Sequence, residues 1–147
     1  MNIFLDSPKV SSAHHIVNTI SGNDAELHCH FNSTTDASVT WRKENELVDI
    51  DDRKKYDVST ASKLTHHTKS TLVIKNVQDS DLGVYQCEVQ NSIGIGHSRL
   101  HLVYVPEPPR FISYDTQDDT VITHWHINSF QPLTEVMLNY KKNGVRK

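Results

Sequence analysis

Long apolar runs and aromatic residues are scarce in this sequence, and their scarcity excludes whole classes of protein. Only 36% of the 147 residues are hydrophobic and 7% are aromatic. No stretch approaches the roughly 18 consecutive apolar residues of a membrane-spanning helix, and no extended apolar stripe follows the helical period. These residues therefore contain neither a transmembrane helix nor the pattern of a helical bundle.

An excess of positive charge is also missing. The formal net charge is −3, so the chain has no basic field that would attract nucleic acid or acidic lipids. The sequence contains no Gly-x-Ser-x-Gly nucleophile elbow and no glycine-rich phosphate loop. Gly94-Ile95-Gly96 lacks the third glycine and lies between two expected strands. We therefore predict that the protein is not an enzyme and uses no nucleic acid, small-molecule substrate or cofactor.

Histidine, in contrast, is plentiful, with ten residues. His28 and His30 share the outer face of one expected strand, about 7 Å apart, a spacing at which two side chains can bind one metal ion. The sequence by itself places no acidic residue or cysteine beside them, and Cys29 points to the opposite face. The sequence therefore predicts no metal site, but a histidine-bearing surface that responds mildly to pH.

Short stretches rich in Val, Ile, Thr and Tyr recur at intervals of about ten residues, separated by Ser, Asn, Asp and Gly, and this texture predicts an all-β sandwich. In residues 25–31 every second residue is apolar or a cysteine and faces the core. Residues 84–89 alternate in the same way, with Tyr85 and Cys87 inward. Further strands are expected around residues 10–20, 39–41, 47–50, 56–58, 72–74 and 97–105.

Two cysteines and a tryptophan single out one kind of sandwich. Trp41 follows Cys29 by a dozen residues, and Cys87 ends the run Asp81-Leu82-Gly83-Val84-Tyr85-Gln86-Cys87. The alternative is a pair of free cysteines in an unrelated β domain, since free cysteines are common and often buried. The two cysteines, the tryptophan and the run at residues 81–87 occur together and agree with the strand alternation. Their combination favours an immunoglobulin-type sandwich over two free cysteines. Residues 22–105, including Asn91-x-x-Gly94, resemble an I-set immunoglobulin domain, which we expect to span residues 8–105.

The resemblance implies a disulfide. In immunoglobulin domains a bridge joins the two sheets and a tryptophan packs on it, which here implies a Cys29–Cys87 bond with Trp41 against it. Such a bridge closes a loop of nearly sixty residues, for which chain entropy gives roughly 4 kcal/mol of stabilisation. Two cysteines far apart in an all-β chain also indicate an oxidising compartment.

Three further residues complete the expected structural set. Tyr85, two residues before the second cysteine, matches the tyrosine corner, whose hydroxyl bonds back to the backbone near the start of its strand. Gly83 suits a close approach of the backbone there. Asp81 is expected to accept hydrogen bonds from the turn and to pair with either Arg53 or Lys55.

Prolines mark a boundary after this domain. The stretch from Val105 to Pro109 contains three prolines, which lack the backbone donor and stiffen the chain into a short hinge. Residues 106–147 resemble the N-terminal part of a fibronectin type III domain. The resemblance rests on Pro108-Pro109, on Trp125 in an expected strand at 121–127, and on Pro132-Leu133 leading to Tyr140 in another at 133–140. Type III domains have seven strands, so the resemblance implies a truncated second sandwich with Trp125 in its core.

An immunoglobulin domain followed by type III repeats is similar to the ectodomain of neural or glial cell-adhesion molecules of the insect lachesin, klingon and wrapper kind. The resemblance implies a cell-surface fragment that binds another protein, homophilically or heterophilically. We expect its signal peptide and membrane anchor to lie outside this stretch. Two alternatives remain open. One is a module of an intracellular, muscle-type giant protein, and the other is part of the ectodomain of a receptor kinase or phosphatase.

Two surface features are expected to matter for recognition. Asn32-Ser33-Thr34 is the single glycosylation sequon, and we expect it in a polar loop just after the first core strand, with a glycan on Asn32. The sheet that carries the core tryptophan presents polar residues of mixed charge outward. Such a surface suits weak contacts multiplied over many copies, and we predict that the binding residues are Arg42, Gln86 and Glu88.

Overall fold

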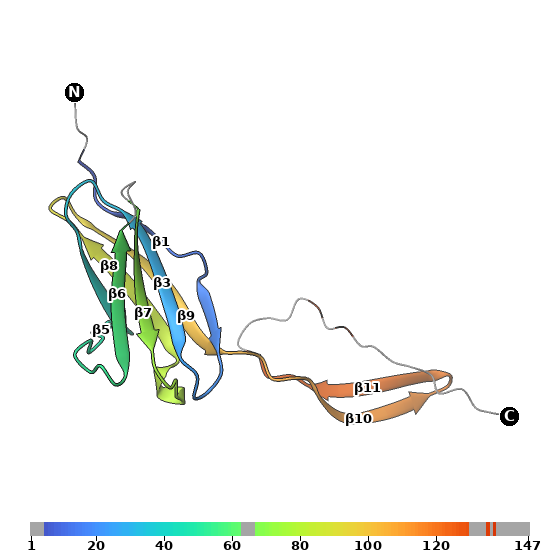
Figure 1. The fold of residues 1–147 in the computed structure, drawn as a ribbon. Coiled ribbons are helices and arrows are strands. Elements are labelled where there is room, and N and C mark those ends of the chain that lie inside the picture. The colour runs from blue at the N-terminus through green and yellow to red at the C-terminus, as the bar shows by residue number, and fades with distance from the viewer. Residues whose placement is uncertain (1–4, 63–66, 130–134, 136, 138–147) are drawn as a thin grey trace. The chain divides into compact units, whose positions relative to one another are not determined.

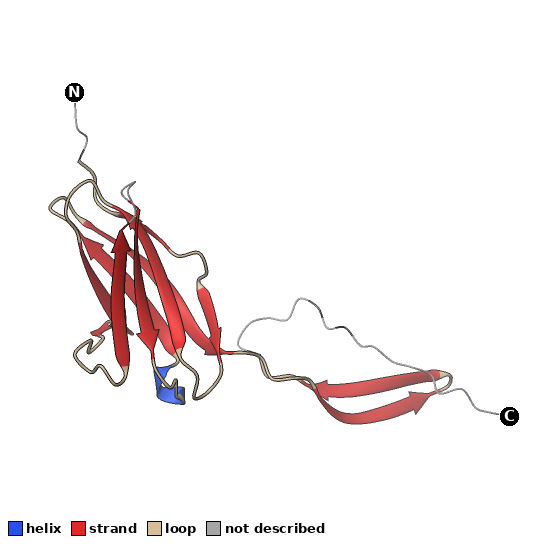
Figure 2. Ribbon diagram, viewed as in Figure 1, coloured by secondary structure: helices blue, strands red, loops and turns tan. Residues whose placement is uncertain are grey.

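The computed structural model describes residues 5–62, 67–129, 135 and 137. The chain divides into two units, Met1–Val105 and Pro106–Lys147, and we treat each by itself. In the described residues nearly all regular structure is strand (Figure 2). One 3-10 turn, η1 (Asp79–Asp81), interrupts the strands of the first unit.

The first unit is a sandwich of two sheets (Figure 1). All strand pairs within it are antiparallel except β2 with β9, which is parallel. The four-stranded sheet has the order β1 (Lys9–Ser11), β3 (Ala25–Asn32), β7 (His67–Ile74), β6 (Tyr56–Ser62). The five-stranded sheet has the order β2 (Ile16–Thr19), β9 (Ile95–Tyr104), β8 (Gly83–Gln90), β4 (Ser38–Lys43), β5 (Glu46–Leu47).

The N-terminal stretch differs from the single weak strand expected around residues 10–20. It forms two strands in different sheets, since β1 pairs with the end of β3 and β2 pairs with the end of β9. Between them the chain crosses the open side of the sandwich, where the Ser12 and Ser98 hydroxyls lie 2.9 Å apart. One short segment therefore covers part of the exposed edge of both sheets, which a single straight strand cannot do.

The core lies between the two sheets and follows the predicted alternation. Every second residue of β3 from Ala25 to Phe31 is buried, and so is every second residue of β8 from Tyr85 to Val89. Leu72 and Ile74 of β7 are fully buried against them. Apolar side chains removed from water on both inner faces are the main force that holds the sheets together. The predicted all-β immunoglobulin-like fold is confirmed.

The second unit contains a hairpin of β10 (Arg110–Gln117) and β11 (Thr120–His126). Asp118 in the connecting turn has a φ of 51°, a left-handed conformation that aspartate tolerates in turns. The rings of Phe111 and Trp125 meet edge to face, with centroids 5.4 Å apart. None of the described residues of this unit is buried. The strand expected at residues 133–140 lies outside the described residues, apart from two isolated positions.

Candidate functional site

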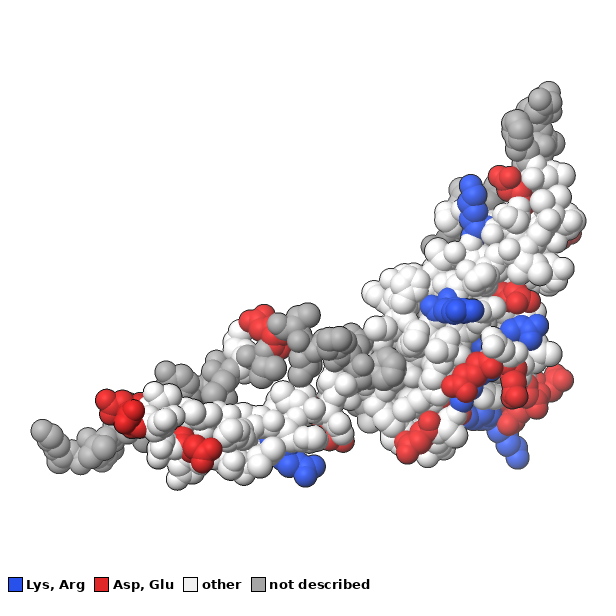
Figure 3. All heavy atoms as spheres, turned by 180° about the vertical axis from the view of Figure 1, so that it is seen from behind, with Lys and Arg blue, Asp and Glu red and all other residues white. Residues whose placement is uncertain are grey.

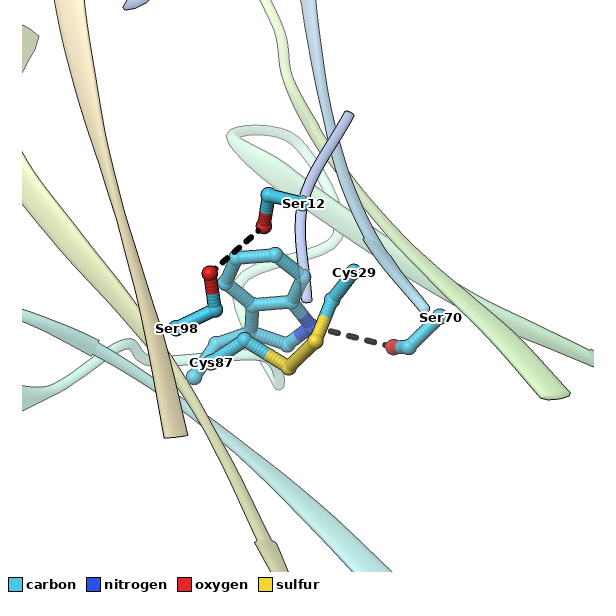
Figure 4. Close-up of a disulfide and its surroundings, with 6 residues drawn as sticks. Ser12, Cys29, Ser70, Cys87 and Ser98 are labelled. Atoms are coloured by element: carbon cyan, nitrogen blue, oxygen red, sulfur yellow. Dashed lines mark hydrogen bonds between the residues drawn. A yellow bond between two sulfur atoms is a disulfide. The ribbon is translucent and has the colours of Figure 1, made fainter. Parts of the chain in front are cut away.

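A disulfide between Cys29 of β3 and Cys87 of β8 joins the two sheets, as predicted. The two Cα atoms are 6.3 Å apart and both side chains are fully buried. Trp41 of β4 stands opposite Cys87 of β8 in the strand pairing. Its Nε1–H donates to the Ser70 hydroxyl at 3.1 Å, a bond drawn to Ser70 as a dashed line in Figure 4. The indole is buried in the same core cluster as the two cysteines, and its polar group is bonded inside the core, as burial of a tryptophan requires.

Asp81 is the centre of a small polar network at one end of the sandwich. Tyr85 donates from its hydroxyl to the Asp81 carbonyl oxygen at 2.8 Å. The Asp81 carboxylate accepts from the Gln78 N–H at 2.8 Å and from the Lys55 ammonium group. Of the two cations considered from the sequence, Lys55 is therefore the partner, and Arg53 lies 3.4 Å from Asp57 instead. Burial, followed by the nearby Tyr56 and Asp81, raises the pKa of Tyr85 strongly, so its hydroxyl stays a neutral donor.

Gly83 has a φ of 133°, a region that side-chain-bearing residues rarely adopt. A Cβ atom here would also lie 2.6 Å from Oε1 of Glu44, but that side chain is flexible and can move. The glycine is therefore needed first for its backbone conformation, rather than for the close approach that the sequence suggested.

Asn91 ties three segments together, which the sequence pattern alone did not reveal. Its side-chain oxygen accepts from the N–H groups of Ile93 and Gly94 at 2.9 and 3.0 Å. Its amide donates to the Asp6 carbonyl at 2.9 Å and to the Ser33 hydroxyl at 3.1 Å. One buried side chain thus closes the β8–β9 turn and holds both the N-terminal segment and the β3–β4 loop.

Asn32 lies at the end of β3, exposed, rather than in the loop expected after the strand. The strand extends to this residue because Asn32 stands opposite Lys9 of β1 and His67 of β7. Trp125 lies on β11 in the second unit, 40% exposed, against Phe111.

Arg42, Gln86 and Glu88 lie together on the outer face of the five-stranded sheet. Nε of Arg42 is 3.6 Å from the Glu88 carboxylate, and the two side chains are 32% and 24% exposed. Nε of Arg99 on β9 donates to the Gln86 side-chain oxygen at 3.1 Å. Two separate polar pairs therefore join β4 to β8 and β8 to β9. Arg99 was missed from the sequence, although the alternation of the last strand places it outward.

Charge on the first unit is mixed in sign. Acidic and basic side chains are interspersed over the face seen in Figure 3, with no broad field of one sign. This agrees with the small net charge of −3. Contacts on such a surface depend on individual pairs rather than on long-range attraction.

His28 of β3 has an acidic neighbour on the same outer face. Oε2 of Glu26 lies 3.5 Å from Nε2 of His28, whose Nδ1 is 3.2 Å from the Thr71 hydroxyl. Within the part of the chain that the structure describes, no group of three or more potential ligands is arranged to bind a metal ion. In the same residues no helix has the length and hydropathy needed to cross a membrane.

Two facing sheets, a disulfide between them and a buried tryptophan opposite one of its cysteines define an immunoglobulin-like β-sandwich. Residues 8–103 match the family model of the Immunoglobulin I-set domain. The chain belongs to this family.

Relatives of this chain are much longer proteins. Hemicentin-2 of Mus musculus is 28% identical over 92 residues, covering 63% of this chain and 2% of the relative. Neural cell adhesion molecule L1.1 of Danio rerio is 24% identical over 142 residues, covering 91% of this chain and 11% of the relative. Myosin-binding protein C, fast-type, of Gallus gallus is 25% identical over 139 residues, covering 90% and 12%.

A solved structure shares the fold. A chain in the crystal structure of Dpr2 Ig1-Ig2 in complex with DIP-Theta Ig1-Ig3 superimposes with a TM-score of 0.63 at 18% identity, covering 69% of this chain and 33% of that chain. The chain thus resembles immunoglobulin modules of adhesion molecules, of a Lar-like tyrosine phosphatase and of muscle proteins.

Proposed function

We propose that this chain is part of a cell-surface adhesion protein that recognises another protein through non-covalent contacts, in neural or glial cell contacts. The observation that carries the proposal is the Cys29–Cys87 bridge, because structural disulfides persist in oxidising, extracellular surroundings. The similarity to neural cell adhesion molecule L1.1 over 91% of the chain supports the same reading. The partner is a second copy of the protein or a different cell-surface protein.

The outer face of the five-stranded sheet is the proposed binding surface. Arg42 and Glu88 form one ion pair on it, and Gln86 is bonded to Arg99. Because these side chains hold each other in place, less side-chain entropy is lost when they contact a partner. These side chains remain partly exposed, so they can exchange their present contacts for contacts with a partner. Each partly exposed ion pair contributes little energy. Weak single contacts multiplied by many copies are what adhesion requires.

The proposed surface is tested by replacing Arg42, Gln86 and Glu88 with alanine together and measuring aggregation of beads or cells coated with the protein. We expect aggregation to fall several-fold. The matched control replaces exposed Asp57, Ser59 and Thr60 of β6 on the other sheet and is expected to aggregate like the wild type. Equal aggregation of both variants, with circular dichroism confirming that both are folded, would remove this surface as the binding site.

We also propose that residues 106–147 are the N-terminal part of a fibronectin type III-like domain. Support comes from the hairpin that carries Trp125 and from two alignments, of 142 and 139 residues, that are too long to end at Pro106. The proposal would fail if a longer version of the protein, extended at its C-terminus, left Trp125 as exposed to fluorescence quenchers as it is in this chain.

The muscle-type alternative draws on the similarity to myosin-binding protein C and makes the opposite prediction about the thiols. A cytosolic module keeps its cysteines reduced. Protein isolated from its native source with thiols blocked, then denatured without reductant, should show no reactive thiol if the surface reading holds. Two reactive thiols would favour the intracellular reading. The full-length transcript tests the receptor-type alternative, because a receptor of that kind would also encode a kinase or phosphatase domain.

A glycan on Asn32 belongs to the same proposal. The side chain is exposed at the end of β3 in a sequon, so a sugar has room to point into solvent. Expression through the secretory pathway should give a protein whose mass falls on treatment with an amide-cleaving glycosidase. Asn32→Gln should abolish that change. An unmodified wild-type protein would contradict the assignment.

A further inference from the structure

Strand β6 is the longest of the four strands that lie at the edges of the first unit's two sheets. The other three edge strands, β1, β2 and β5, have three, four and two residues. Short edge strands are one of the ways in which proteins keep a sheet edge from pairing with another chain. The seven residues of β6 lack this protection.

Other protective features are also missing from β6. Its sequence contains no proline and no lysine, and its pairing with β7 runs without a bulge. Its one charged residue is Asp57, and residues 59–62 are all exposed. Within residues 5–62 and 67–129, no strand pairs with its outer edge. Because prolines, lysines and bulges are what usually blocks an edge, this one is open to another extended strand.

The backbone of β6 presents alternate residues to its free edge. The Lys75 N–H donates to the Lys55 carbonyl oxygen at 2.8 Å, just before β6 begins. In an antiparallel pair the hydrogen-bonded positions recur at every second residue. The residues that bond to β7 are therefore Asp57, Ser59 and Ala61. The residues whose N–H and C=O groups point to the free edge are Val58, Thr60 and Ser62.

The sequence of β6 suits pairing with a second copy of itself. Two antiparallel copies related by a twofold axis at Ser59 overlap over the full length of the strand. In this register Val58 of one copy stands opposite Thr60 of the other, and both backbones direct their polar groups into the gap. Both side chains are β-branched, which favours a strand. The only charge, on Asp57, stands opposite Ala61, so no like charges meet.

We propose that two copies of this chain pair through the free edges of β6 and join their four-stranded sheets into one continuous antiparallel sheet. Main-chain hydrogen bonds between Val58 of one copy and Thr60 of the other hold the pair, as in other cases of strand addition. The proposed binding surface lies on the five-stranded sheet and stays free in such a dimer. The pairing is therefore an interface separate from that surface.

Sedimentation equilibrium of the full chain over a range of protein concentrations tests the pairing. We expect the wild type to show a monomer–dimer equilibrium. Thr60→Pro removes the outward N–H from both copies and leaves the bonds to β7 in place, since proline is tolerated where an edge N–H faces solvent. It should weaken association at least about tenfold. Thr60→Ala is the matched control, because it keeps the N–H, and should associate like the wild type.

Single cysteines test the register. Ser59→Cys places two thiols opposite each other, with Cα atoms about 4.5 Å apart, a spacing that a disulfide can bridge. Ala61→Cys is the control, because the twofold register separates the two copies of that residue by about 13 Å along the strand. Under mild oxidation we expect Ser59→Cys to give a covalent dimer and Ala61→Cys to give little.

The pairing is refuted if the wild type stays monomeric at concentrations up to about 1 mM, or if Thr60→Pro and Thr60→Ala associate equally. If Thr60→Pro does not fold, equal cross-linking of the two cysteine variants refutes it. Replacing Arg42, Gln86 and Glu88 with alanine should leave the dimer unchanged, and loss of the dimer in that variant would also refute the pairing. Failure of the proposed binding surface is thus distinguished from failure of this interface.

Discussion

At the scale of residues, Asp81 shows how one buried carboxylate organises an end of the sandwich. Its carboxylate accepts hydrogen bonds from the backbone N–H of Gln78, just before η1, and from the ammonium group of Lys55. Its carbonyl oxygen accepts a hydrogen bond from the hydroxyl of Tyr85. The carboxylate is only 7% exposed and Lys55 is 25% exposed. A charge this deeply buried is tolerated because it is both paired and hydrogen-bonded.

Removing the cation should therefore cost more than removing an exposed one. We expect Lys55→Met to lower the free energy of unfolding by about 2–3 kcal/mol, because it leaves the Asp81 charge buried without its partner. Arg53→Met is the matched control, since the Arg53 side chain is 75% exposed, and it should cost under about 1 kcal/mol. Urea unfolding curves with equal slopes measure both. Equal losses would contradict the burial argument.

Sequence reasoning identified Asp81, Gly83 and Tyr85 from their spacing to the second cysteine, but it did not choose between the two cations. The choice depends on the path of the loop before β6, where Lys55 turns inward and Arg53 turns towards Asp57. Adjacent long side chains of like charge carry no pattern that distinguishes them. Which of the two cations pairs with Asp81 depends on the geometry of the loop, and the periodicity of the sequence does not predict loop geometry.

At the scale of elements, the N-terminal segment and the start of β9 are in very close contact. A Cβ atom on Gly96 would lie 2.3 Å from the carbonyl oxygen of Pro8 and 2.8 Å from Cγ2 of Val10. The first distance is to backbone, which cannot rotate away. Gly96 is therefore required because another strand passes over it, a reason that the Gly94-Ile95-Gly96 pattern did not reveal.

Gly96→Ala should displace the N-terminal strand. We expect a loss of about 1–3 kcal/mol in the free energy of unfolding, typical of overpacking, together with faster hydrogen exchange in β1. Gly94→Ala is the control, because its Cβ would lie 3.1 Å from the Ser7 side chain, which can adjust more easily. A Gly96→Ala protein with wild-type stability and exchange would show that the contact is not needed.

Alternation predicted the central strands well and the edge strands poorly. β3 and β8 have one buried face each, so a period of two in the sequence identifies them and their inward residues. The N-terminal segment, residues 9–19, has no such constraint, since its residues pack against two sheets in turn. Its division into β1 and β2 depends on the free edges of β3 and β9, with which the two strands pair. Those edges exist only once the sandwich has formed, so the local sequence does not predict the division.

At the scale of the whole molecule, the two units differ in how completely they bury their apolar residues. In the first unit, fully buried side chains such as Leu27 and Leu102 fill the space between the sheets. In the second, Phe111, Tyr114, Val121 and Trp125 are 40% exposed or more. The proline-rich boundary after Val105 was visible in the sequence, whereas the exposure of these apolar residues was not.

An isolated hairpin is marginally stable in water. We therefore expect the amides of residues 110–126 to exchange at least about a hundredfold faster than those of β8 in the same molecule. Hydrogen exchange at pH 7.5 and low protein concentration measures both units together. Protection of the hairpin equal to that of β8 would contradict this expectation. Protection that appears only at high concentration would indicate that copies of the chain cover the apolar face.

The bridge between Cys29 and Cys87 has a mechanical consequence for the adhesion role proposed above. The bonded cysteines are 58 positions apart. Under tension applied at the two ends of the first unit, only the chain outside that loop is free to lengthen. An unfolded loop of this size would add about 200 Å of extended chain, and the covalent bond withholds all of it. The module therefore has a limited reach under tension. In the proposed adhesion role, cutting this one sulfur–sulfur bond would let two joined surfaces move apart without releasing each other.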